Sequence, residues 1–192
     1  MDDPAATSIV CASRAYQIDQ AKLRRVSDKI KASLGVGDHH LSVALVGSRR
    51  IRTLNREFRG KDQATDVLSF PQIDWGAPLA VRPTGNGARR GRGKRGEKPP
   101  AGARASDAGV RAPAPVLGDV VISLPEAARS ASKLGQGVDR EVCFLLVHGI
   151  LHLCGHDHEV PQDERRMRAA QRTLMRLIGR GWASSVKPRR GR

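Results

Sequence analysis

The feature that most constrains the fold of this chain is a nearly continuous apolar stretch that contains two histidines. Residues 138–154 read VDREVCFLLVHGILHLC, and Gly155 follows them. Apolar residues on all sides of a helix predict that the helix is buried, so this one belongs at the centre of the domain. Glycine permits the left-handed turn that ends a helix. At 192 residues the chain is long enough to bury such a helix within one domain.

Three histidines in and after this stretch predict a metal site. Residues four apart lie on the same face of a helix, so His148 and His152 can hold one ion together. The turn at Gly155 can bring His158 back to the same point. Three neutral imidazoles leave one position of a tetrahedral zinc ion open, which is typical of a catalytic site. We therefore expect one Zn²⁺ per chain, although another divalent metal would also fit. Asp157, in the turn, is either exposed or a carboxylate that orients a ligand imidazole.

The histidine spacing also matches the peptidase pattern HExxHxxGxxH, with one informative departure. Gly149 stands where these peptidases carry the glutamate that takes a proton from the zinc-bound water. A zinc peptidase is therefore a disfavoured alternative. Cys154 lies about 200° around the helix from His152, so we expect it to face away from the metal.

The remaining pattern predicts helices and strands on both sides of a weakly structured segment. We expect Asp19 to cap a helix that ends before Gly35, and Ser123 with Glu126 to form a capping box at the start of a helix that ends near Gly135. In the second helix, Ile51, Leu54 and Phe58 should face inward, and the last helix should finish at Gly179. The expected helices are 19–34, 48–58, 123–135, 138–154 and one around 167–178, and the expected strands are 41–46, 65–70 and 117–122.

This order of elements predicts an α/β (α+β) fold in a single domain, residues 1–192. A small mixed sheet of three to four strands would be covered by about five helices, with the metal site at the end of the central buried helix. Residues from about 75 to 115 are rich in Gly, Pro and Arg without apolar periodicity, so we expect a disordered basic insertion. Residues 184–192 form a basic tail.

The net charge and the cysteine content indicate which kinds of partner and which cellular compartment to expect. The net charge of +15 suggests a polyanionic partner, nucleic acid before membrane, although much of the excess lies in the insertion and the tail. The three cysteines have no metal-like or disulfide-like spacing and are expected to be small buried side chains. No signal peptide or membrane-spanning segment is apparent, so a cytoplasmic location is expected.

Three sequence blocks together resemble the bacterial YbeY-type endoribonucleases, the rRNA maturation factors. The blocks are HGILHLCGHDH, preceded by LNREFRGKDQATDVLSFP at residues 54–71 and LGDVVIS at residues 117–123. The resemblance implies an α/β fold with one zinc ion and cleavage of single-stranded RNA. It also implies work in 16S rRNA 3′-end maturation and late ribosome quality control. The partners would then be an rRNA precursor and the ribosome, with ribosomal proteins as further partners.

The resemblance also assigns roles to residues near the metal. His148, His152 and His158 would be the zinc ligands, and Arg59 would lie in the cleft as a catalytic residue. An arginine pairs bidentately with phosphate and can stabilise charge that develops during its transfer. Three further residues are candidates for the second shell or for substrate contacts: Lys61 as a phosphate contact or an exposed charge, Asp66 as an orienting group or a strand-start carboxylate bonded to backbone amides, and Ser69.

Two functional alternatives remain at this stage. In the first, zinc assists phosphodiester cleavage, with either water or the ribose 2′-hydroxyl as the nucleophile, because no general base is obvious in the sequence. In the second, the protein is a non-catalytic, zinc-containing RNA-binding factor in ribosome assembly. An open fourth coordination position favours the enzyme, and a fourth protein ligand favours the binder. The basic insertion either adds RNA affinity through phosphate contacts or is merely tolerated.

Overall fold

The computed structural model describes residues 7–82, 114–179 and 181–189, and its core is a mixed four-stranded sheet. The strands run in the order β1-β3-β5-β4, where β1, β3 and β5 are parallel and β4 is antiparallel to β5. Their bounds are β1 Thr7–Cys11, β3 His40–Val46, β4 Val67–Pro71 and β5 Val116–Ser123. The described residues form five helices, so the predicted fold class is confirmed.

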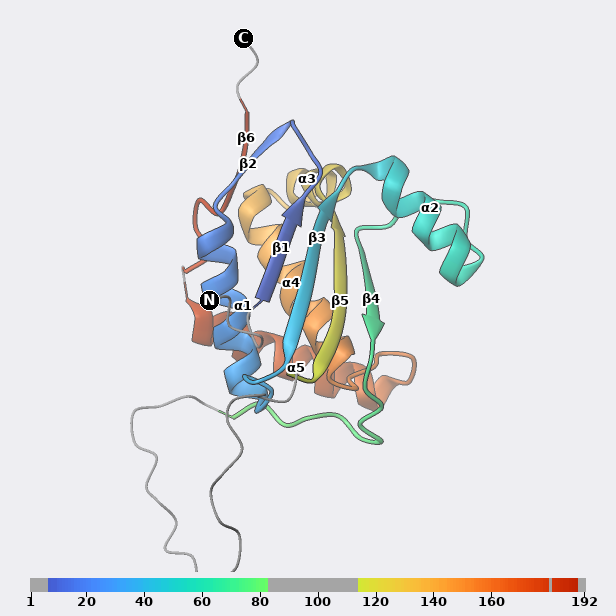
Figure 1. Cartoon of the computed structure of the whole chain (residues 1–192), viewed down its shortest axis with the longest axis vertical. Helices are drawn as coiled ribbons and strands as arrows, with labels where there is room; N and C mark the ends of the chain where they lie inside the picture. Colours follow the sequence, from blue (N-terminus) through green and yellow to red (C-terminus); the bar gives the residue numbers. More distant parts are fainter. Residues whose placement is uncertain (1–6, 83–113, 180, 190–192) are drawn as a thin grey trace, which may run out of the picture.

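Helix α4, Val138–Leu153, is the central buried helix that the sequence predicted. It contacts β4 and β5 as well as α1, α3 and α5. In Figure 1 it crosses behind the sheet, and α5 lies near its lower end. These neighbours are α1 Gln20–Leu34, α3 Leu124–Lys133 and α5 Pro161–Ile178. Because α4 is enclosed, its apolar side chains join those of α1 and the inner sheet face in one core.

The caps of α1 agree with the sequence, whereas the predicted capping box of α3 is wrong. The Asp19 side chain accepts a hydrogen bond of 2.9 Å from the Lys22 backbone N–H, and Gly35 ends the helix at φ 77°. At α3, Ser123 is also the last residue of β5, and its N–H donates to Asp66 O. The Ser123 hydroxyl is buried without a hydrogen-bond partner, so the strand geometry overrides the side-chain cap.

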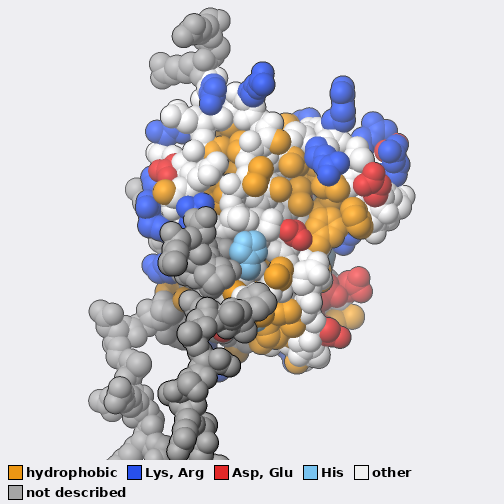
Figure 2. Space-filling view, viewed as in Figure 1, with side chains coloured by type: hydrophobic (Ala, Val, Ile, Leu, Met, Phe, Trp, Pro, Cys, Tyr) orange, Lys and Arg blue, Asp and Glu red, His pale blue; other side chains and the backbone are white. Residues whose placement is uncertain are grey.

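Helix α2, Ser48–Arg59, packs on the opposite face of the sheet. One of its residues that was predicted to face inward is exposed. Ile51 is fully buried against Val46 and Leu68, but Phe58 is 64% exposed. Figure 1 shows why, because the end of α2 extends beyond the sheet. Phe58 instead meets Phe70 edge to face with ring centroids 5.0 Å apart. Hydrophobic side chains accordingly gather on the surface beside α2 (Figure 2).

Residues 75–82, predicted to begin the disordered insertion, are packed against the core. Trp75 donates from Nε1 to Leu153 O at 2.8 Å, and Leu79 N–H donates to Cys154 O at 3.1 Å. Arg82 N–H donates to Ser33 O at 2.7 Å. The boundary was wrong because this segment has no apolar periodicity and is held by its contacts with the end of α4. Of the predicted insertion, residues 83–113 lie outside the described residues.

Three short strands were not predicted. β1 was missed because five residues with a threonine and a serine give a weak pattern. β2 Tyr16–Ile18 and β6 Val186–Pro188 pair antiparallel, so part of the predicted basic tail is a strand. Within the described part of the chain, no helix is long and apolar enough to cross a membrane.

Candidate metal centre

The three predicted histidines converge at the end of α4. His148 and His152 occupy its last two turns, and Gly155, at φ 82°, reverses the chain so that His158 returns to them. One ligand atom from each residue lies within 4.8 Å of the others, and His148 Nε2 is 3.2 Å from His152 Nε2. Tetrahedral zinc with Zn–N bonds of about 2.0–2.1 Å requires nitrogens roughly 3.3 Å apart. The spacing of His148 and His152 therefore fits a tetrahedral metal ion, and the group of three could hold one if the ring of His158 moves closer to the other two.

The surroundings of the two helix-borne histidines favour neutral imidazoles, the form that binds a metal. Burial lowers the pKa of His152 to about 4, and the nearby His148 and His158 rings add to this shift. Burial also lowers the pKa of His148. Their lone pairs are consequently available at neutral pH, and protons compete with a metal only in acid.

Gln171 on α5 contacts a predicted ligand and was missed from the sequence. Its Oε1 lies 3.5 Å from His148 Nδ1, and its Nε2 donates to Phe144 O at 3.2 Å. A proton held on Nδ1 leaves the Nε2 of His148 free for the ion. The sequence signal was a polar residue on the buried face of α5, beside Met167 and Leu174.

The other polar side chains near the three imidazoles have hydrogen bonds or packing of their own. Cys154 packs in the core, as its helical angle predicted, and burial raises its pKa to about 12. His156 is buried, with Nε2 2.8 Å from Leu79 O. Asp157 Oδ1 accepts a hydrogen bond of 2.7 Å from the backbone N–H of His158, which stabilises the turn, and the Asp157 charge acts on His152. Among the described residues the cluster contains three histidines and no fourth protein ligand.

The histidines open into a cleft of about 340 Å³ between the end of α2 and strand β4. Of the other predicted site residues, the structure brings Arg59, Asp66 and Ser69 to this cleft. Lys61 is exposed and does not line it. Thr65 lines the cleft as well and was not predicted. A cation and three imidazoles therefore face one space large enough for a phosphodiester group.

Arg59 is the last residue of α2, and the loop that follows it is tied back to the helix by side-chain hydrogen bonds. Asn55 is buried and donates from Nδ2 to Gln63 O at 2.9 Å. Arg52 and Asp62 form a bidentate pair with contacts of 2.9 and 2.7 Å, and this hydrogen bonding holds the pKa of the Asp62 carboxyl below its usual value. Asp62, the last residue of the RGKD segment, thus closes the loop, a role that the sequence did not reveal.

Strand β4 forms the other wall of the cleft. Asp66 Oδ1 accepts hydrogen bonds from the backbone N–H of Val67 at 2.9 Å and from the Thr65 hydroxyl at 3.2 Å. This is the backbone-bonded alternative that the sequence left open for Asp66. Asp66 directly precedes β4, and Ser69 lies within the strand, close to Gly149 of α4.

Position 149 has no room for the glutamate of a zinc peptidase. A Cβ added to Gly149 would lie 2.6 Å from Val120 Cγ1 and 3.1 Å from Ser69 Oγ. The glycine is therefore required by the close approach of α4 to the sheet, and a longer side chain there would separate the two.

Known proteins resemble this chain in sequence over most of its length. A family model described as "Endoribonuclease YbeY" matches residues 9–179. A protein of that name from Anaeromyxobacter sp. is 42% identical over 158 residues, 82% of this chain and 64% of the relative. The Thermus thermophilus protein of that name is 35% identical over 81% of this chain and 88% of the relative. The chain thus spans slightly less than two thirds of the Anaeromyxobacter relative.

The fold is also shared with a solved structure. The solution structure of a Thermotoga maritima protein superposes with a TM-score of 0.53 at 22% identity and covers 90% of this chain and 89% of that one. Together with the match of the family model, the identities to the relatives confirm the resemblance seen in the three sequence blocks. The chain belongs to the YbeY endoribonuclease family.

Proposed function

We propose that this protein is a zinc-dependent endoribonuclease that cuts single-stranded RNA. The observation that carries the proposal is the convergence of three imidazoles and Arg59 on one cleft without a fourth protein ligand among the described residues. The relatives named as endoribonucleases support it. The lack of room for a glutamate at Gly149 counts against the peptidase alternative.

The histidines and the charged residues in and beside the cleft have separate parts in this proposal. His148, His152 and His158 hold the ion, with Gln171 orienting the His148 ring. When bound, zinc supplies Lewis-acid chemistry, activating a nucleophile and polarising the phosphate. Arg59 binds the phosphate through its planar guanidinium and offsets the charge that develops there. Lys61, exposed on the adjoining loop, contacts RNA outside the cleft.

The proposed cellular role is in 16S rRNA 3′-end maturation and late ribosome quality control in the cytoplasm, with the ribosome and its proteins as partners. The basic composition of residues 83–113 and of the chain end supports an RNA partner, because cationic side chains that neutralise phosphates release counterions.

The proposal is tested with 5′-labelled RNA of one sequence, offered single-stranded or annealed to its complement. We expect cleavage of the single strand, loss of cleavage when zinc is chelated, and recovery when zinc is restored. Analysis of the ends distinguishes the nucleophiles, because attack by the 2′-hydroxyl leaves a 2′,3′-cyclic phosphate and attack by water does not. Tight RNA binding without cleavage by the zinc-loaded protein would instead identify a non-catalytic assembly factor.

A further inference from the structure

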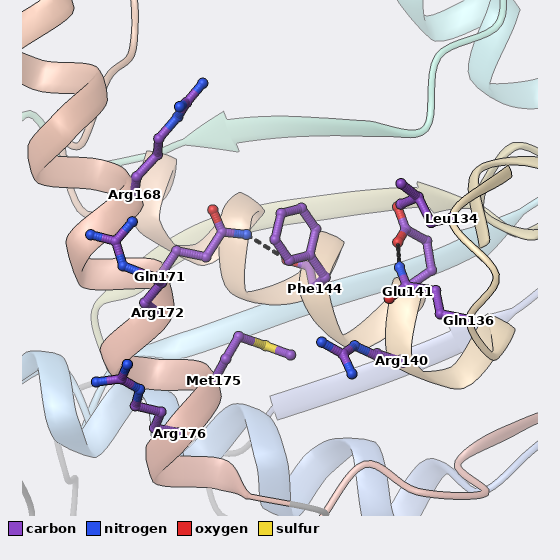
Figure 3. A pocket seen from close by; sticks show the side chains of 10 residues that line it. All are labelled: Leu134, Gln136, Arg140, Glu141, Phe144, Arg168, Gln171, Arg172, Met175 and Arg176. Atoms are coloured by element: carbon purple, nitrogen blue, oxygen red, sulfur yellow. Dashed lines mark hydrogen bonds between the residues drawn. The ribbon is translucent and has the colours of Figure 1, made fainter.

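A second hollow, the α4–α5 pocket, lies between the first half of α4 and the second half of α5. Its volume is about 540 Å³, and it is separate from the cleft that contains the histidines. Figure 3 shows that α4 supplies Arg140 and Phe144, whereas α5 supplies a row of arginines and Met175. The α5 arginines are Arg168, Arg172 and Arg176. None of these side chains has a part in holding the metal.

The pocket carries positive charge that the protein itself neutralises only in part. Arg168 pairs with Glu164. Arg140, Arg172 and Arg176 have no ion-pair partner in the described ranges. The acidic residue of the lining, Glu141, accepts a hydrogen bond from Gln136, and burial raises its pKa. Three cations without ion-pair partners therefore line this space together with one carboxyl group.

The same pocket presents an aromatic surface. Phe144 is 41% exposed although its helix is otherwise the most buried in the protein. Met175 lies opposite it on α5, as Figure 3 shows. Aromatic rings beside cationic side chains are the combination with which proteins bind single-stranded nucleic acid, since every base can stack and every phosphate is negative.

The positions along the helices connect this pocket with the metal centre. Arg140, Phe144, His148 and His152 follow at four-residue intervals on α4, so neighbouring members lie on adjoining turns of one face. Gln171 joins the two sites directly, because it contacts both the Phe144 carbonyl and the His148 ring. The α5 arginines also recur every four residues, about 6 Å apart along the helix axis.

We propose that the α4–α5 pocket binds the RNA segment adjacent to the bond cut at the metal centre. A base stacks on Phe144 while Arg172 and Arg176 contact successive phosphates. The inference rests on the proposed endoribonuclease function and names the part of the substrate that this surface recognises. The occupant is RNA because the cations without ion-pair partners and the exposed ring adjoin the histidine-bearing part of α4, to which Gln171 connects them.

The experiment compares Arg172→Gln/Arg176→Gln with the control Arg25→Gln/Arg166→Gln, which removes equal charge from exposed positions outside the pocket. The substrates are a 16-nucleotide and a 4-nucleotide RNA that are cut at the same bond. For each, single-turnover cleavage is measured at increasing concentrations of zinc-loaded protein, which gives the protein concentration at which the rate is half-maximal. For the longer RNA we expect this concentration to rise about tenfold in the pocket variant. When the logarithm of this protein concentration is plotted against the logarithm of the salt concentration, the slope should be smaller by about 1.4 in the pocket variant, because two phosphate contacts are lost.

The 4-nucleotide RNA should be cut alike by all three proteins, because it does not reach the pocket. Phe144→Leu should weaken use of the longer RNA severalfold, and Phe144→Tyr should restore it, as stacking requires. Equal behaviour of pocket and control variants, or an equal loss on both RNA lengths, would overturn the inference while leaving the endoribonuclease proposal intact. If the wild-type protein cuts neither RNA, the proposed function itself fails.

Discussion

The metal centre is built from two regions that the fold holds in different ways. His148 and His152 lie on the most buried helix of the protein, whereas His158 and Arg59 lie on exposed segments at the ends of helices. The helix-borne pair is fixed by the packing of α4 between the sheet and its neighbouring helices. His158 depends on the turn after α4, where its backbone N–H donates to Asp157, and Arg59 is the exposed last residue of α2.

This difference suggests separate roles for the buried and the exposed residues of the site. In the proposed site, the pair of histidines on the buried helix would define where an ion sits, and their lowered pKa keeps both imidazoles neutral and able to bind it. Exposed groups complete the site where substrate must enter. Substitution of His148 or His152 should therefore abolish metal binding. Substitution of His158 should reduce metal affinity only in part, and substitution of Arg59 should reduce catalysis without loss of the metal.

The largest expected effect is that of His152→Ala. Removing this ligand should abolish zinc binding and RNA cleavage while circular dichroism shows the helices retained. His158→Ala, the matched change in the exposed half, should weaken zinc affinity by a smaller factor, so that excess zinc restores part of the cleavage. Metal analysis after dialysis measures both. If the two variants lose zinc equally, the distinction between the regions is wrong.

Arg59→Ala should lower the cleavage rate about 10²–10³-fold, which is the size of effect seen when one group that stabilises transition-state charge is removed. Zinc content should stay at the wild-type level because Arg59 is not a ligand. Arg59→Lys should recover only part of the rate, since a lysine lacks the planar fork. Kinetics on metal-loaded proteins test this, and a wild-type rate for Arg59→Ala would remove the residue from the mechanism.

Gly149→Ala tests the packing that positions the helix-borne pair. The added methyl group meets Val120 Cγ1 at 2.6 Å, so the free energy of unfolding should fall by about 1–3 kcal/mol through overpacking. Gly37→Ala is the control, because its added Cβ meets Ala32 only at ordinary contact distances of 3.7 Å and beyond. Urea denaturation compares them. Equal stabilities would mean that α4 does not pack against β5 as described.

The metal-free protein should lose stability as the pH falls from about 6.5 towards 4. In the folded protein the pKa of His152 is about 4, whereas its ordinary value is 6.5. As the pH falls, His152 is therefore protonated in the unfolded chain before it is protonated in the folded protein, which stabilises the unfolded state. The loss should be about 1–2 kcal/mol for this residue. Denaturation of metal-free wild type and His152→Phe across this range measures it; an equal pH dependence in both would contradict the assignment.

Local sequence patterns predicted the elements that are regular and buried. The apolar run of α4, the cap at Asp19 and the turn at Gly155 each follow from residue types within a few positions, and all three are present. The three histidines could be found for the same reason, because two share a helix face and the third follows a required turn.

Contacts between distant segments could not be predicted in this way. Gln171 meets His148 across two helices, and Trp75 is held by the Leu153 carbonyl although its own segment has no periodicity. Phe58 has the spacing of a core residue, yet it is exposed because α2 extends past the sheet that would cover it. Each of these contacts or exposures depends on how far a helix or strand extends relative to its neighbours in the fold. The residues next to it in the sequence do not determine this.

The central claim is that three imidazoles share one catalytic zinc ion, and a stoichiometric titration tests it most directly. Zinc is added in fractions of an equivalent to metal-stripped protein, and cleavage of single-stranded RNA is measured at each step. Activity should rise linearly from near zero and level off at one zinc per chain, with no rise in His152→Ala. Full cleavage by the stripped protein, or a rise of equal size in His152→Ala, would contradict the account.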